Sequence, residues 1–86
     1  MKVKDISTRT EEKLIIYVGS DTYECQNNAM VKQKGLHHTI KIDVREKNMV
    51  LEQEVVNISV QANRMNTTIH IQTKVSNFKN SEAEDF

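Results

Sequence analysis

Apolar and polar residues alternate along three stretches of this chain. The segment 37–45 alternates Ile, Ile and Val with Thr, Lys, Asp and Arg, and the segments 56–62 and 69–75 follow the same rule. Successive side chains of a strand point to opposite faces, so a period of two places the apolar residues of each segment on one face. Valine, isoleucine and threonine also favour strands. Each segment is therefore predicted to be a strand that is packed on one side and solvated on the other.

Short polar segments separate the predicted strands. Gly19 follows an apolar run at 13–18, and glycine supplies the positive φ that tight turns require. Gly35 is expected to turn the chain in the same way, and the segments 45–48 and 63–66 are expected to be hairpin turns. Short connections join antiparallel neighbours, so we predict a mostly β fold, a small antiparallel meander that forms a barrel or sandwich of five to seven strands. The expected core combines the apolar strand faces: Leu14, Ile16, Val18, Ile40, Ile42, Val44, Val56, Ile58, Val60, Ile69, Ile71 and Val75.

Two segments also have helical features. The segment 21–35 begins with an acidic pair at the spacing of a capping box and ends in glycine, but it has no apolar stripe and its paired asparagines suit a turn. The segment 46–65 has apolar residues at spacings of three and four, yet its β-branched residues favour a strand. The alternative to the mostly β fold is therefore an α+β fold with a helix at about 22–34 or 46–64.

The length and composition indicate one small domain. The chain has 86 residues, of which 37% are hydrophobic and none is tryptophan. A domain of this size buries only about two-thirds of the surface of its unfolded chain, so a partner or a second copy would complete its thin core. The alternation stops after residue 75. We therefore expect a single β-rich domain at 1–79 and an acidic, flexible tail at 80–86.

The cysteine content and the apolar runs indicate the compartment. Cys25 is the only cysteine, whereas small extracellular domains usually carry paired ones. The first residues are charged and do not form a signal sequence, and the longest apolar run, at 14–18, is too short to cross a bilayer. We expect a cytoplasmic protein with no membrane partner.

Few residues have the pattern of a catalytic or metal site. His37 and His70 are weak candidates for metal ligands and would meet only if their strands were neighbours. Cys25 lies in no catalytic motif, and the glycines are too far apart for a phosphate-binding loop. We therefore expect no enzymatic activity, no metal and no cofactor, and we interpret the protein as a non-enzymatic interaction module. It would bind protein partners or self-associate through its sheet edges.

An alternative function is the binding of single-stranded nucleic acid by a barrel of the OB type. Outside the tail, 12 basic residues stand against 9 acidic ones, because three of the 12 acidic residues lie in 80–86, which leaves a net charge of +3. Tyrosines would stack on bases and basic residues would contact phosphates. The candidate residues for this function are Tyr17, Tyr23, Lys32, Lys34, Lys41, Arg45 and Lys74.

The last residues, SEAEDF, resemble the acidic tip of bacterial and phage single-stranded-DNA-binding proteins, which ends in acids and phenylalanine. The likeness covers about five residues of the 86 and lacks the proline that usually precedes the phenylalanine. It implies a tail that docks on a partner protein, with Phe86 as the anchor and Glu82, Glu84 and Asp85 as the steering charges.

Overall fold

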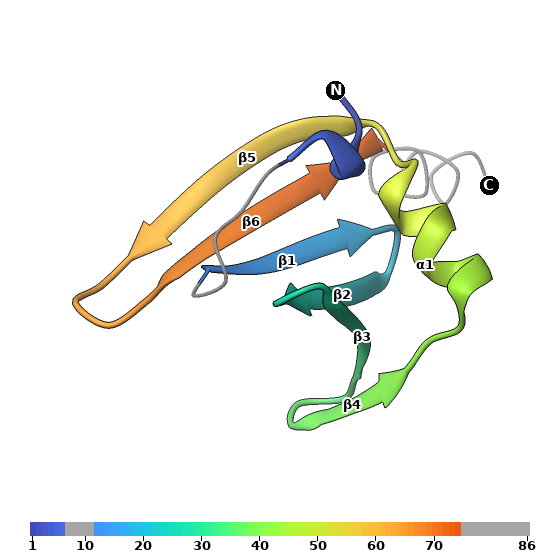
Figure 1. Ribbon diagram of the computed structural model, residues 1–86, viewed down its shortest axis with the longest axis horizontal. Helices are drawn as coiled ribbons and strands as arrows, with labels where there is room; N and C mark the ends of the chain where they lie inside the picture. The colour runs from blue at the N-terminus through green and yellow to red at the C-terminus, as the bar shows by residue number, and fades with distance from the viewer. Residues whose placement is uncertain (7–11, 75–86) are drawn as a thin grey trace, which may run out of the picture.

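The computed structural model describes residues 1–6 and 12–74, which form one six-stranded sheet with a short helix on one face (Figure 1). The elements are η1 (Val3–Asp5), β1 (Glu12–Val18), β2 (Asp21–Gln26), β3 (Ala29–Lys34), β4 (His38–Lys41), α1 (Val44–Leu51), β5 (Val55–Ala62) and β6 (Thr67–Thr73). The predicted mostly β class is confirmed, with six strands. The sheet is open and does not close into a barrel, with β4 at one edge and β5 at the other.

The order of strands in the sheet is β4-β3-β2-β1-β6-β5. Strands β1 to β4 form the expected antiparallel meander, in which each strand pairs with the next. The chain then passes through α1 and returns on the other side of β1, where β6 pairs parallel to β1 and antiparallel to β5. Parallel neighbours such as β1 and β6 cannot be joined by a hairpin and need a longer crossover connection. The segment that contains α1 carries the chain across the sheet, so that β5 and β6 can lie on the other side of β1.

Four residues with positive φ shape the turns of the meander. Asn27 and Asn28 have φ of 56° and 67°, so the link between β2 and β3 is a two-residue turn of the kind that hairpins favour. Gly19 and Gly35 have φ of 62° and 75° at the neighbouring turns, as the sequence predicts. The alternative helix at 22–34 is therefore wrong, because the asparagines divide this segment into two strands.

The helix α1 begins earlier than either sequence interpretation allowed. Asp43 is its N-cap and accepts a hydrogen bond from the backbone N–H of Glu46 (2.8 Å). The predicted strand through Val44 and the predicted turn at 45–48 are both wrong, because this cap starts a helix where the alternation still continues. The alternative helix at 46–64 is correct only at its start, since β5 occupies the second half.

The core lies between α1, η1 and one face of the sheet, which we call the helix-side face. Its buried members are Val3, Leu14, Ile16, Val18, Tyr23, Met30, Val50 and Ile71. The core prediction is confirmed for the apolar face of β1 and for Ile71, while Ile42 and Ile69 are half-buried against the same cluster. Val75 lies outside the described residues. The prediction missed Val50, because the favoured interpretation of 46–65 was a strand, and the helix there was only the alternative.

Five residues expected in the core are exposed instead: Ile40, Val44, Val56, Ile58 and Val60. Val44 lies in α1 itself, and Val56 lies at the register shift between Val55 and Asn57. For the other three, the reason is the small size of the covering layer. Eight helical residues span about 12 Å, whereas a seven-residue strand such as β6 spans about 23 Å. Figure 1 shows α1 at one end of the sheet, while β5 and β6 extend beyond it toward their hairpin. The apolar face of β5 is therefore only partly covered.

The first residues of the chain are fastened to the end of α1. The ammonium groups of Lys2 and Lys4 donate to the two carboxylate oxygens of Glu52, at 2.8 and 2.7 Å. The backbone N–H of Val3 donates to the carbonyl of Gln53 (3.0 Å). The hydrogen bonds from the two lysines lower the pKa of Glu52 to about 2. This contact holds Val3 over the core.

Val50→Ala should destabilise the domain by about 2 kcal/mol, because it leaves a cavity under the only helix that covers the described sheet. The matched control is Val44→Ala in the same helix, at a side chain that is 72% exposed. That change should alter the free energy of unfolding by less than about 0.5 kcal/mol. Urea denaturation of the two variants measures both values. Equal losses would contradict the proposed packing of α1.

Glu52→Gln should reduce stability at neutral pH but not in acid. The pKa of Glu52 rises from about 2 in the folded chain to its ordinary value of 4.5 on unfolding, so unfolding takes up a proton between these pH values. The stabilisation by Glu52 is therefore present above this window and is lost as pH falls through it. Thermal melts across the window should show the wild type and the variant converging. A constant difference in melting temperature would show that the lysines do not act on the charge of Glu52.

Candidate functional site

The outer edge of β5 is one of the two edges of the described sheet. Its eight residues, VVNISVQA, include no charged side chain and no proline. Charged residues, proline and short length are the usual means by which proteins protect an edge strand from further pairing. The opposite edge strand, β4, has only four residues and carries Lys41. Of the two edges, β5 lacks these three protections, and a register shift between Val55 and Asn57 interrupts its pairing with β6 only at its start.

The first residues of the chain cover the beginning of this edge. Lys2 forms a bridge with Glu54, and the backbone N–H of Val55 donates to the carbonyl of Met1 (2.8 Å). Among the described residues, the backbone of 56–62 makes no further hydrogen bond outside its pairing with β6. In the described part of the chain, the backbone donors and acceptors of 56–62 that point away from β6 have no partner. We call the stretch 56–62 the β5 edge.

The apolar side chains of the β5 edge are also exposed. Ile58 and Val60 lie opposite Ile71 and Ile69 of β6, so they share the helix-side face with the core. Their exposed fractions are 41% and 64%, because α1 ends before it reaches them. The β5 edge thus combines free backbone groups with an apolar stripe that continues from the core.

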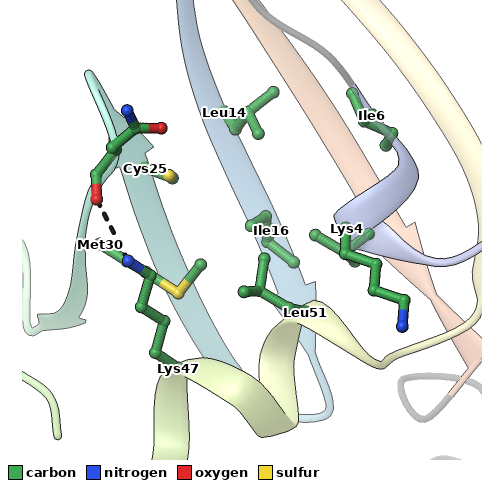
Figure 2. Close-up of a pocket in the computed structure, with 10 residues that line it drawn as sticks. Lys4, Ile6, Leu14, Ile16, Cys25, Met30, Lys47 and Leu51 are labelled. Carbon is green, nitrogen blue, oxygen red and sulfur yellow. Dashed lines mark hydrogen bonds between the residues drawn. The ribbon is translucent and has the colours of Figure 1, made fainter. Parts of the chain in front are cut away.

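A cavity of about 250 Å³ lies between η1, α1 and the helix-side face. Its lining is Val3, Lys4, Ile6, Leu14, Ile16, Cys25, Asn28, Met30, Lys47 and Leu51. Figure 2 shows Met30 reaching toward Ile16 and Leu51, with Lys47 crossing beside it. The ammonium group of Lys47 donates to the carbonyl of Asn28 (3.3 Å). Seven of the ten lining residues are aliphatic or contain sulfur, and the other three are Lys4, Asn28 and Lys47.

Cys25 is a half-buried free thiol in the lining of this cavity. Burial raises the pKa of the thiol, and the positive charge of Lys47 partly opposes that rise. A raised pKa leaves little thiolate at neutral pH, and the thiolate is the reactive form. The geometry agrees with the sequence interpretation of Cys25 as a small core residue that shares a face with Tyr23.

Tyr23 links α1 to the sheet. Its hydroxyl donates to Glu46 (2.6 Å), and the ammonium of Lys32 lies 3.4 Å from the same carboxylate and 5.9 Å from the centre of the tyrosine ring. Burial, followed by the hydrogen bond to Glu46, raises the pKa of Tyr23 above its ordinary range. The ring is buried, and this arrangement is structural.

The face opposite α1, which we call the open face, carries a short hydrogen-bonded chain. The Tyr17 hydroxyl lies 2.9 Å from Nδ1 of His70, and Nε2 of His70 lies 3.2 Å from Oε1 of Gln61. His37 is far from this chain, in the turn before β4, and three strands separate β4 from β6. The two histidines are therefore not neighbours. In the described part of the chain, no group of three or more His, Cys, Asp and Glu residues is placed to hold a metal.

The residues considered for nucleic-acid binding do not gather on one surface. Register places Tyr17 and Lys41 on the open face, but Tyr23, Lys32 and Lys34 on the helix-side face. The other two candidates lie elsewhere, Arg45 in the first turn of α1 and Lys74 directly after β6. The tail residues Glu82, Glu84, Asp85 and Phe86 lie outside the described residues.

Sequence reasoning missed Lys47 and Glu46, since both were assigned to a turn. The signal that could have found them is the spacing of Asp43 and Glu46, which fits an N-cap and the third residue of a helix. A helix from Val44 would have placed Lys47 and Val50 on neighbouring positions of one face, three residues apart.

No family model, no curated protein and no solved structure matches this chain. Within residues 1–6 and 12–74, no helix has the length and apolar character needed to cross a membrane.

Proposed function

We propose that this chain is a non-enzymatic interaction module that self-associates by pairing the β5 edge with the β5 edge of a second copy. The observation that carries this proposal is an edge strand of eight residues with no charge, no proline and exposed apolar side chains. An unprotected edge of this kind is a template for a further strand.

Antiparallel pairing of two identical strands satisfies two-fold symmetry, because each copy offers the same surface to the other. The axis would stand perpendicular to the sheet, so both copies would keep the helix-side face on the same side. Ile58 and Val60 of the two copies would then form one continuous apolar stripe, and each cross-strand pair of this kind contributes roughly 0.2–1 kcal/mol. No like charges would meet, since β5 carries none.

Single-strand nucleic-acid binding has less support, because the tyrosines expected to form one stacking surface lie on opposite faces of the sheet. The proposed module acts in the cytoplasm, where the thiol of Cys25 would stay reduced.

Sedimentation velocity over about a hundredfold range of concentration tests the proposal. The wild type should rise from the monomer mass of 10.0 kDa toward twice that value. Val60→Lys should keep the monomer mass throughout, because it places a charge in the edge at a side chain already 64% exposed.

The matched control is Thr39→Lys, which adds the same charge to the exposed edge strand β4. It should associate like the wild type. A wild type that stays at 10.0 kDa at every concentration would overturn the proposal, as would association of Val60→Lys with unchanged strength. Circular dichroism confirms that each variant is folded.

A further inference from the structure

Two lysines line the cavity between η1, α1 and the sheet, and one of them has no anionic partner among the described residues. Lys4, at one side of the cavity, is already bound to Glu52. Lys47 has no carboxylate within ion-pair distance among the described residues, and its ammonium donates only to the carbonyl of Asn28. An ammonium group has three N–H donors, so Lys47 can bind an anion and keep its hydrogen bond to Asn28.

The remainder of the cavity fits an apolar group. Its depth is formed by aliphatic and sulfur-containing side chains, among them Ile16, Met30 and Leu51 (Figure 2). The volume of about 250 Å³ exceeds the roughly 150 Å³ of an apolar cavity that holds benzene. A chain of several methylene groups, or a phenyl ring with a short chain, is of the right size.

We propose that this cavity binds a small monocarboxylate with an apolar tail, of which octanoate is the simplest probe. The tail would displace water from Ile16, Met30 and Leu51, and the carboxylate would pair with the ammonium of Lys47 at the margin, where water still reaches it. Burial of the tail is favoured by the hydrophobic effect, and the charge pair orients the ligand. A cationic ligand of the same shape is disfavoured by Lys47. The site is independent of the β5 edge, since none of the residues in its lining belongs to β5.

Cys25 reports on this cavity, because it is the only cysteine of the chain and its thiol lines the cavity. A second hollow that shares Lys47, of about 340 Å³, does not include Cys25 in its lining. A ligand in the first cavity should therefore slow the alkylation of Cys25 by iodoacetamide, whereas a ligand in the second hollow should not. The measurement compares octanoate with octanamide, which has the same tail and no charge.

Octanoate should slow the alkylation in a saturable manner, and octanamide should need about threefold to fivefold higher concentration for the same protection. Lys47→Met should abolish the difference between the two ligands, whereas Lys47→Arg should retain it. The matched control is Lys34→Met, which removes a lysine of β3 that does not line the cavity. Protection is expressed relative to the ligand-free rate of each variant, because Lys47 itself influences the pKa of Cys25.

Two results would overturn the proposal. One is an alkylation rate that octanoate leaves unchanged up to the concentration at which it forms micelles. The other is equal protection by octanoate and octanamide in the wild type, which would show that Lys47 takes no part. Circular dichroism of Lys47→Met and Lys47→Arg verifies folding, and the comparison of ligands in the wild type alone decides the matter if a variant fails to fold.

Discussion

The structure depends on how one short helix covers one face of a six-stranded sheet. The side chain of Val50 is buried in the same apolar cluster as residues of the sheet, and the hydrogen bond from Tyr23 to Glu46 joins the first turn of α1 to β2. The helix has only eight residues, so it covers one end of the sheet. Two features follow from this limit. The far part of β5 keeps its apolar side chains exposed, and a cavity remains where α1 and η1 meet the sheet without filling the space between them.

The N-terminal segment extends this small covering layer. Lys2 and Lys4 bind the carboxylate of Glu52 at the end of α1, which places Val3 in the core. The same segment pairs with the beginning of β5 and protects that part of its edge. Among residues 1–6 and 12–74, this protection ends at Val55, whose backbone N–H donates to the carbonyl of Met1.

The sequence was sufficient to predict β5 and β6 but not what covers them. A period of two identified their apolar faces, and the polar segment 63–66 marked the turn between them. The same period says nothing about whether another layer lies on that face, so Ile58 and Val60 were expected in the core. The start of α1 was also missed, because the alternation of apolar and polar residues continues through Val44 and predicts a strand there. In the folded chain the hydrogen bond from the backbone N–H of Glu46 to Asp43 starts a helix instead.

The candidate sites were harder to predict for a related reason. The cavity joins Ile6, Cys25 and Lys47, which come from three separate segments, and only the folded chain brings them together. The prediction that His37 and His70 could share a metal site required their strands to be neighbours. The strand order places three strands between β4 and β6, so the two histidines are apart. Edge position is likewise a property of strand order. The absence of charge from β5 was visible in the sequence, but its importance was not.

Amide hydrogen exchange of β5, followed residue by residue at low and at high protein concentration, tests the central claim most directly. The account predicts that the amides of 56–62 that do not bond to β6 exchange rapidly in dilute solution and become protected in concentrated solution. The amides of the other edge strand, β4, should exchange at the same rate in both. Equal exchange of the β5 amides at the two concentrations would contradict self-association through this edge.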